Sequence, residues 1–210
     1  DCGETLLTVL NDVLDMSKID AGRMELENAP FVPADVLRRI EALYDLRAQE
    51  KRLHLSVLVT EAAERPRRGD AHRVSQILHN LLSNAVKFTE SGRVSLELTV
   101  LDGTALAPRD GHAAELCLRL SVRDSGIGID KVDQLRVFDK FQEVGDISTH
   151  STSQAQFGGK GVGLGLTLAK GIIETHDGLV WVESAGADQG SCFSALLPLA
   201  NPNEERYVLG

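Results

Sequence analysis

Hydrophobic residues along the chain alternate between a helical period and a strand period, which predicts a mixed α/β domain. Apolar residues three and four apart predict helices over residues 4–27, 34–50, 70–88 and 162–175. Short runs rich in β-branched residues predict strands over residues 53–59, 93–101, 115–123, 179–184 and 191–197. The last two strands form a predicted hairpin, so we expect a mixed sheet with helices on one face. The expected fold class is α+β, a two-layer α/β sandwich.

The first predicted helix has an unusually wide apolar stripe. Its apolar positions are Leu6, Leu7, Val9, Leu10, Val13, Leu14 and Met16. A helix that is apolar over more than a third of its circumference needs two neighbours, as in a helical bundle. We therefore expect a bundle-type helix over residues 1–24, a compact domain over residues 25–200 and a C-terminal tail over residues 201–210.

Composition and charge exclude several classes of protein. The chain has 210 residues, of which 42% are hydrophobic, enough to bury a core and to exclude disorder. It has neither a bilayer-length apolar run nor a signal pattern, so we expect a cytoplasmic protein with no membrane partner. The net charge of −9 is unsuited to nucleic acid, and we expect the short basic stretch over residues 65–68, which Pro66 interrupts, to form a solvated turn. Three widely spaced cysteines indicate a reducing compartment.

The helix predicted over residues 70–88 carries candidate binding residues. Its polar face holds Arg73, Gln76, Asn80, Asn84 and Lys87. Asparagine is a mediocre helix former, so two asparagines one turn apart indicate a function. Their amide oxygens, followed by the ammonium of Lys87, could hold a cation and the phosphates that it carries. The alternative is that both asparagines cap the helix or face solvent.

Two glycine-containing motifs indicate a nucleotide pocket. Asp124 follows an apolar strand and precedes Gly126 and Gly128, so its carboxylate could accept a hydrogen bond from an exocyclic amine such as that of adenine. The alternative is a plain Asp-Ser-Gly turn. Residues 158–165 hold five glycines ahead of a helix, and the N–H groups of such a loop can bind phosphate. A flexible hinge is the alternative, because the loop matches neither the Walker motif nor the dinucleotide fingerprint.

A long polar segment separates these two motifs. Residues 142–161 show no apolar period, and a loop of this length inside a compact domain is typical of a lid. Phe138 and Phe141 lie just ahead of it, in a chain that has few aromatic residues. They could anchor the hinge of the lid or form a small satellite cluster.

The order of these motifs resembles that of the catalytic, ATP-binding domain of sensor histidine kinases. The N box of that family is similar to residues 80–89, the G1 box to residues 124–128, the F box to residues 138–141 and the G2 box to residues 161–166. Residues 6–22 resemble the second helix of the dimerisation and histidine phosphotransfer hairpin. The resemblance implies the Bergerat ATP-binding fold of the GHKL superfamily. It also implies protein-histidine kinase activity in two-component signal transduction, with ATP and Mg²⁺ as cofactors.

The resemblance further implies roles for individual residues. Asn84 matches the Mg²⁺ ligand, with Asn80 as a supporting polar residue and Lys87 as a contact to the phosphates, and these three are the implied catalytic residues. Asp124 matches the carboxylate that binds adenine. The other implied nucleotide contacts are Phe88, Gly126, Gly128, Ile129, Phe138, Phe141, Lys160, Gly161, Val162, Gly163, Leu164, Gly165 and Leu166.

The chain departs from the family in one important respect. The phospho-accepting histidine of such kinases lies in a His-Glu/Asp-x-Arg-x-Pro pattern, which none of the six histidines here has. We therefore expect a part of a longer kinase that phosphorylates a histidine outside this chain. The smaller departures are Val162, where Thr is frequent, and the added charge of Lys160. The implied partners are ATP, the phosphotransfer hairpin of the parent kinase, a response regulator receiver domain and a second copy in a full-length homodimer.

Two other functions are alternatives. A nucleotide-binding pseudokinase or scaffold module would keep the fold without the transfer, although all four motifs are intact. A gyrase-like ATPase would carry a glutamate one turn before the Mg²⁺ asparagine as general base for water. This chain has Asn80 there, and an amide cannot abstract a proton.

Overall fold

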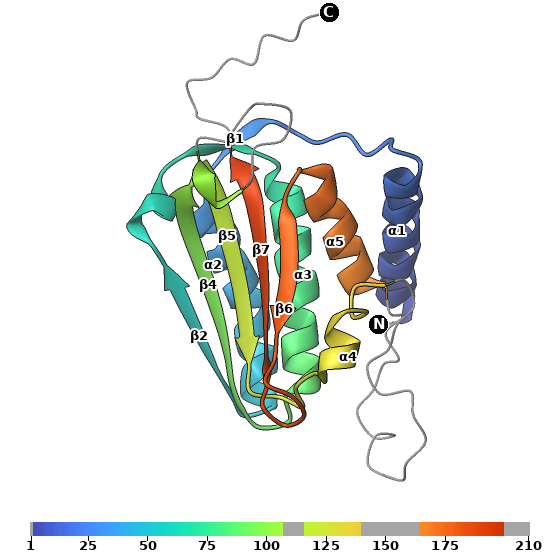
Figure 1. Cartoon of the computed structure of the whole chain (residues 1–210), viewed down its shortest axis with the longest axis vertical. Helices are drawn as coiled ribbons and strands as arrows, with labels where there is room; N and C mark the ends of the chain where they lie inside the picture. Colours follow the sequence, from blue (N-terminus) through green and yellow to red (C-terminus); the bar gives the residue numbers. More distant parts are fainter. Residues whose placement is uncertain (1, 107–115, 140–163, 200–210) are drawn as a thin grey trace, which may run out of the picture.

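A computed structural model describes residues 2–106, 116–139 and 164–199 of the chain. Figure 1 shows helices covering one face of a five-stranded sheet, which confirms the two-layer α/β sandwich. The strand order is β2-β4-β5-β7-β6, with β2 (Leu53–Val59), β4 (Gly92–Asp102), β5 (Leu116–Asp124), β6 (Leu179–Glu183) and β7 (Ser191–Leu199). The helices are α1 (Cys2–Asp20), α2 (Pro33–Glu50), α3 (Ala71–Phe88), the single turn α4 (Lys131–Gln134) and α5 (Gly165–Thr175).

The sheet is mixed, as the sequence predicts. Strands β2 and β4 run parallel, and the crossover between them contains α3. The pairs β4–β5, β5–β7 and β6–β7 are antiparallel. This topology places the end of β5 beside the start of β7, because Asp124 is opposite Ser191 in the register.

The end of the first helix differs from the prediction. Helix α1 ends at Asp20, not at residue 27. Gly22 has a φ of 62°, and the N–H of Arg23 donates to the carbonyl of Lys18. This left-handed glycine just past the helix is a common C-terminal motif, which stops the helix although apolar residues follow.

The structure also contains a small sheet that the sequence analysis missed. Strands β1 (Ala29–Phe31) and β3 (Arg67–Gly69) pair in antiparallel fashion. The prediction of a solvated turn over residues 65–68 is therefore wrong for its second half. Arg67 and Arg68 are half-buried, and Arg68 Nη2 donates to the carbonyl of Asn28 at 2.7 Å.

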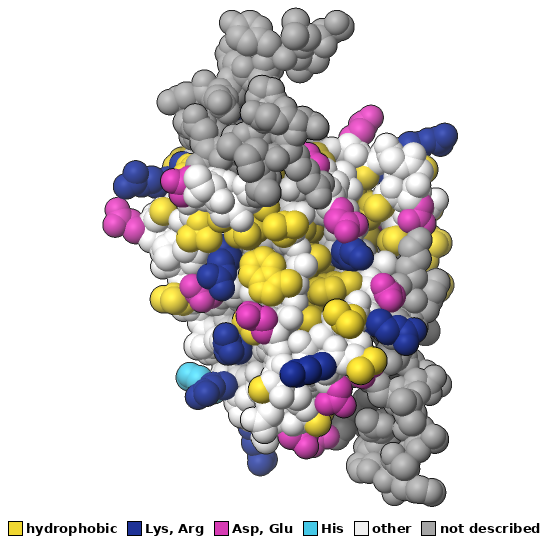
Figure 2. Space-filling model, viewed as in Figure 1, with side chains coloured by type: hydrophobic (Ala, Val, Ile, Leu, Met, Phe, Trp, Pro, Cys, Tyr) yellow, Lys and Arg dark blue, Asp and Glu magenta, His cyan; other side chains and the backbone are white. Residues whose placement is uncertain are grey.

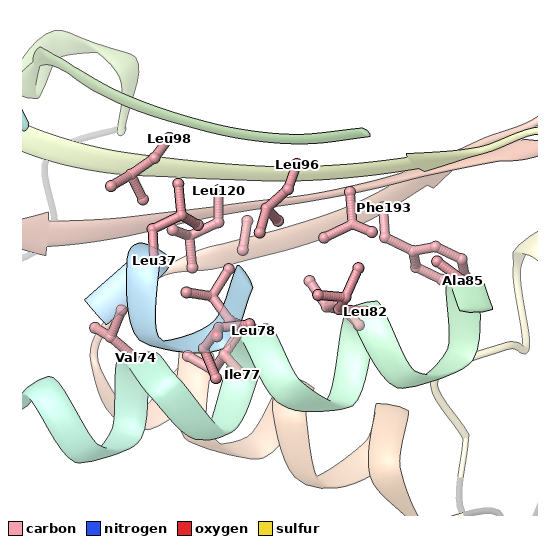
Figure 3. Close-up of a cluster of buried hydrophobic side chains, with 14 of the residues drawn as sticks. Leu37, Val74, Ile77, Leu78, Leu82, Ala85, Leu96, Leu98, Leu120 and Phe193 are labelled. Carbon is pink, nitrogen blue, oxygen red and sulfur yellow. The ribbon is translucent and has the colours of Figure 1, made fainter. Parts of the chain in front are cut away.

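The main core lies between α3 and the sheet. Figure 3 shows how the apolar stripe of α3 points toward the strands; the labelled residues are Leu37, Val74, Ile77, Leu78, Leu82, Ala85, Leu96, Leu98, Leu120 and Phe193. Burying a side chain of this size contributes about 1.5–3 kcal/mol. This packing fixes the rotation of α3 about its axis, so that its polar face points away from the sheet.

The N-terminus of α3 is fixed by Asp70. One carboxylate oxygen of this buried residue accepts from the N–H of Arg73 at 2.9 Å, and the other accepts from the N–H of Glu27 at 3.0 Å. The first contact is an N-cap, which satisfies an otherwise unpaired helix donor. The second ties the segment after α1 to the start of α3.

The opposite face of the sheet carries a smaller apolar cluster. Figure 2 shows hydrophobic side chains gathered on this face; the cluster consists of Leu101, Leu106, Cys117, Trp181 and Leu196. Burial and the charge of Asp102 raise the pKa of the Cys117 thiol, which disfavours the reactive thiolate. Among the described residues, no helix combines the length and the hydropathy that crossing a bilayer requires.

Candidate functional site

Several predicted site residues meet around one pocket at the C-terminal end of α3. The pocket is partly open to solvent and is lined by Asn84, Ala85, Phe88, Asp124, Ile127, Gly128, Ile129, Val137, Leu166 and Phe193. The lining combines the last turns of α3, the end of β5 and the segment after it, the start of α5 and one residue of β7. A mostly apolar wall with a few polar groups is typical of a site for a small organic ligand.

Asp124 is the buried carboxylate of the pocket, with 8% of its surface exposed. Its Oδ1 accepts from the N–H of Gly126 at 2.8 Å, and its Oδ2 accepts from the hydroxyl of Ser191 at 2.5 Å. The local Asp-Ser-Gly turn is therefore formed. Each carboxylate oxygen can accept more than one hydrogen bond, so Asp124 can still accept from a ligand that enters the pocket.

Ser191 is a residue of the site that the sequence analysis missed. It is buried at the start of β7, opposite Asp124 in the register. Its hydroxyl holds the carboxylate in place from the neighbouring strand. The available signal was a serine after a glycine at the start of a predicted strand, which does not reveal the pairing of strands.

Gly126 and Gly128 are required by close approaches of the backbone. A Cβ at position 126 would lie 2.3 Å from the carbonyl oxygen of Phe88, and the N–H of Ile127 donates to that oxygen at 3.3 Å. Gly128 has a φ of 67°, and a Cβ there would lie 2.0 Å from the carbonyl oxygen of Gly186. The glycines therefore allow the turn after β5 to fit between the end of α3 and the β6–β7 loop.

The residues on the polar face of α3 contact different parts of the molecule. Asn84 is half-buried and lines the pocket. Asn80, one turn earlier, faces the start of α5, because a Cβ at Gly165 would lie 3.4 Å from Asn80 Oδ1. Arg73 and Gln76 contact α1 instead. The polar residues do share one face of α3, as the sequence predicts, but only those in the C-terminal half of the helix lie near the pocket.

Asn80 and Lys87 each present a donor group on this face of α3. Asn80 Nδ2 is buried and has no hydrogen-bond partner within the described part of the chain. A buried donor of this kind calls for an acceptor from a ligand or from water. The ammonium of exposed Lys87 lies 5.0 Å from the ring centroid of Phe88, a cation–π contact at the edge of the pocket.

Phe138 packs against a residue of the pocket wall. Its ring packs edge-on against Phe193, with the centroids 6.0 Å apart, and Phe193 lines the pocket. The hydroxyl of Thr167 on α5 donates to the carbonyl of Asp139 at 3.1 Å. This bond ties the residue after Phe138 to α5. Phe138 therefore packs against the main core beside a pocket-lining residue, and its role as an anchor for the lid stays a prediction.

Part of the predicted site lies outside the described residues. This applies to Phe141, Lys160, Gly161, Val162 and Gly163, to the lid predicted over residues 142–161 and to the tail over residues 201–210. Leu164 is buried directly ahead of α5, Gly165 is the first residue of that helix, and Leu166 lines the pocket. Ile129 is also buried in the lining.

Comparisons with known proteins agree on one family. The sequence family described as "Histidine kinase-, DNA gyrase B-, and HSP90-like ATPase" matches residues 69–201. The hybrid signal transduction histidine kinase K of Dictyostelium discoideum is 31% identical over 206 residues, which cover 97% of this chain and 16% of that protein. The circadian input-output histidine kinase CikA of Synechococcus elongatus is 38% identical over 212 residues, which cover 98% of this chain and 25% of that protein.

Solved structures show the same similarity. Full-length ShkA in complex with AMPPNP has a TM-score of 0.74 and 30% identity, over 95% of this chain and 37% of that one. The histidine kinase AdeS of Acinetobacter baumannii has a TM-score of 0.68 over 94% of this chain and 80% of that one; at 20% identity it shows the fold alone. The chain spans about a sixth to a quarter of the length of the two curated relatives.

Proposed function

Because this chain belongs to the family of histidine kinase-, DNA gyrase B- and HSP90-like ATPases, we propose that it is the ATP-binding catalytic domain of a sensor histidine kinase. In this proposal it transfers the γ-phosphoryl group of ATP to a histidine outside the chain. We assign residues 25–200 to the ATP-binding domain and residues 1–24 to the second helix of a phosphotransfer hairpin. The further proposed partners are the rest of that hairpin, a response regulator and, in the full-length kinase, a second copy.

The observation that carries the proposal is the buried carboxylate of Asp124 at an apolar pocket. The walls formed by Ile129, Val137 and Phe193 suit a flat heterocycle such as adenine. The exocyclic amine of adenine is a donor, and Asp124 is a fixed acceptor with free lone pairs. A hydrocarbon chain would leave this acceptor without a matching donor, and a sugar would leave the apolar walls without an apolar partner.

The amide groups of α3 fit a Mg²⁺ ion that arrives with the triphosphate. Among the described residues, no three His, Cys, Asp or Glu side chains gather as a metal site. Mg²⁺ can be held by a neutral amide oxygen when phosphates supply the negative charge, and we assign this role to Asn84. The unpaired donor of Asn80 would bind a phosphate oxygen. When bound, Mg²⁺ would neutralise charge on the transferred phosphoryl group.

The remaining phosphate contacts are assigned to Lys87 and the glycine-rich segment. The ammonium of Lys87 is exposed above the ring of Phe88 and can turn toward a triphosphate. Helix α5 begins at Gly165, and a helix N-terminus favours phosphate through its free N–H groups and its dipole. We propose that Gly161, Gly163 and Gly165 wrap the phosphates there.

The residues also favour transfer to histidine over hydrolysis. A hydrolase needs a general base beside the attacking water, and Asn80 cannot abstract a proton. The described residues would act by holding ATP, orienting its phosphates and stabilising charge. An imidazole is already a nucleophile, so it needs no such base.

Calorimetry with a non-hydrolysable ATP analogue, with and without Mg²⁺, tests the binding site. We expect Mg²⁺-dependent binding by the unchanged chain. Asp124→Asn should weaken binding about tenfold or more, since a donor would replace a buried acceptor. Asn84→Ala should remove most of the Mg²⁺ dependence, whereas Asn11→Ala, an exposed control on α1, should behave as the unchanged chain.

Transfer is tested by adding ATP, Mg²⁺ and the separately produced hairpin of the parent kinase. We expect phosphohistidine on the hairpin and little release of free phosphate without it. Nucleotide binding without transfer would favour the scaffold alternative. Rapid release of phosphate without the hairpin would favour an ATPase.

A further inference from the structure

Lys51, the residue that follows α2, reaches across to the end of α3. Its ammonium donates to three carbonyl oxygens, those of Val86 at 2.6 Å, Lys87 at 3.2 Å and Thr89 at 3.0 Å. The last carbonyls of a helix have no partner within the helix and carry a partial negative charge. A lysine ammonium has three donors, so Lys51 satisfies three acceptors at once.

The chain around Lys51 holds it at this place. Lys51 is itself the C-cap of α2, and its N–H donates to the carbonyl of Arg47. The side chain is half-buried between the ends of two helices. Burial lowers the pKa of the ammonium, whereas the charge of Glu90 raises it. The net effect is a lowered pKa, and the three hydrogen bonds to carbonyl oxygens hold the ammonium in place despite this cost of desolvation.

The segment that Lys51 holds is a wall of the candidate site. The carbonyl groups of Lys87 and Thr89 flank Phe88, which lines the pocket. The carbonyl oxygen of Phe88 accepts from the N–H of Ile127, in the turn that follows Asp124. Lys51 is not among the pocket-lining residues, so its route of contact to the pocket is the backbone at the end of α3.

We propose that Lys51 is a positioning residue for the nucleotide pocket, which fixes the end of α3 so that Phe88 and the Asp124 turn keep the separation that the nucleotide requires. This inference rests on the proposed function and adds a residue that its motifs do not contain. The physical reason is preorganisation: a peptide segment that is already ordered loses less entropy when the ligand binds. A helix end without Lys51 would sample several orientations of the Phe88 carbonyl.

The test compares Lys51→Met, which keeps the apolar stem but loses all donors, with Lys51→Arg, which keeps the charge and the donors. Three quantities are measured: the affinity for the ATP analogue with Mg²⁺, the thermal unfolding without nucleotide, and the amide hydrogen exchange of Ile127. We expect Lys51→Met to bind about tenfold more weakly and to exchange faster at Ile127. Lys51→Arg should recover most of the affinity for the ATP analogue and most of the slow exchange at Ile127.

Two controls separate positioning from stability. Tyr44→Phe removes a hydrogen bond from the Tyr44 hydroxyl to the carbonyl of His79, at 3.2 Å, elsewhere between α2 and α3. It should lower stability but leave nucleotide affinity unchanged. Lys131→Met removes an exposed ammonium from α4 and should change neither. If Lys51→Met does not fold, Lys51→Gln, which keeps two donors, should show an intermediate loss of affinity.

Wild-type affinity in folded Lys51→Met, or in folded Lys51→Gln if only that variant folds, would overturn the inference and leave the proposed function standing. Absence of nucleotide binding by the unchanged chain would overturn both. The measurement on the unchanged chain therefore distinguishes the two failures.

Discussion

Arg73 of α3 and Asp15 of α1 form an ion pair that ties the first helix to the helix of the candidate site. The two contacts are 2.6 Å from Arg73 Nη1 to Asp15 Oδ2 and 3.3 Å from Nη2 to Oδ1. Gln76 donates to Asp15 Oδ2 at 3.0 Å and accepts from Arg73 Nη1 at 2.7 Å. The Arg73 and Asp15 side chains are only 13% and 15% exposed. The position of α1 is therefore coupled to a helix that lines the pocket.

We predict that Asp15→Asn loosens α1. The variant keeps the shape of the side chain but removes its charge, which leaves Arg73 poorly compensated. We expect the free energy of unfolding to fall by about 1–3 kcal/mol and hydrogen exchange in α1 to accelerate. Urea unfolding and exchange measurements check this. Asp35→Asn, which breaks an exposed pair with Arg38, should have a much smaller effect; equal effects of the two variants would contradict the prediction.

The same ion pair predicts a pH dependence of stability. Burial alone would raise the pKa of Asp15, but hydrogen bonds from Arg73 and Gln76 and the charge of Arg73 outweigh it and lower the pKa below 3.8. A carboxyl group with a lowered pKa stabilises the fold above its unfolded pKa, and this contribution is lost as the pH falls through the folded value. The stability difference between the unchanged chain and Asp15→Asn should therefore shrink below about pH 4. Urea titrations across this range measure it, and a difference that grows on acidification would show that the sign is wrong.

We predict that Ser191→Ala weakens nucleotide binding. Its hydroxyl donates to Asp124 Oδ2, and losing it leaves a buried carboxylate oxygen with one partner fewer and a less defined orientation. We expect the affinity for the ATP analogue to fall about three- to tenfold. Ser194→Ala is the matched control, because its buried hydroxyl bonds to Ser121. Calorimetry should find an effect for Ser191→Ala alone; similar losses in both variants would point to general destabilisation.

We predict that Gly126→Ala destabilises the domain and impairs the pocket. The added Cβ would lie 2.3 Å from the carbonyl oxygen of Phe88 and 2.9 Å from Asp124 Oδ1, so either α3 or the turn must move. We expect a loss of about 2–4 kcal/mol in the free energy of unfolding. Thermal and urea unfolding measure this. Gly3→Ala, where a Cβ meets nothing within 4 Å, should not destabilise.

The long elements were predictable because their signals are local. The apolar spacing in α3 follows from the helical repeat, and the predicted start and end match Asp70 as N-cap and Phe88 as last residue. Both ends of strand β2 were predicted correctly, because the signal of a strand is also local. Strands β1 and β3 have three residues each, too few for a period, and they form because Ala29 meets Gly69 far along the chain. Local pattern carries no information on such a pairing.

The sequence alone determined which residue types are available at the site: the amides of α3, the carboxylate after β5 and the glycines that allow a tight turn. Only the tertiary structure decided which neighbour each side chain meets. It directs Arg73 to α1 and turns Asn80 toward α5. It also brings Ser191 to Asp124, and Lys51 to the end of α3, from distant segments. The physical reason is that a residue's position on its own helix or strand follows from backbone geometry. Its partners on other elements follow from how the apolar faces pack.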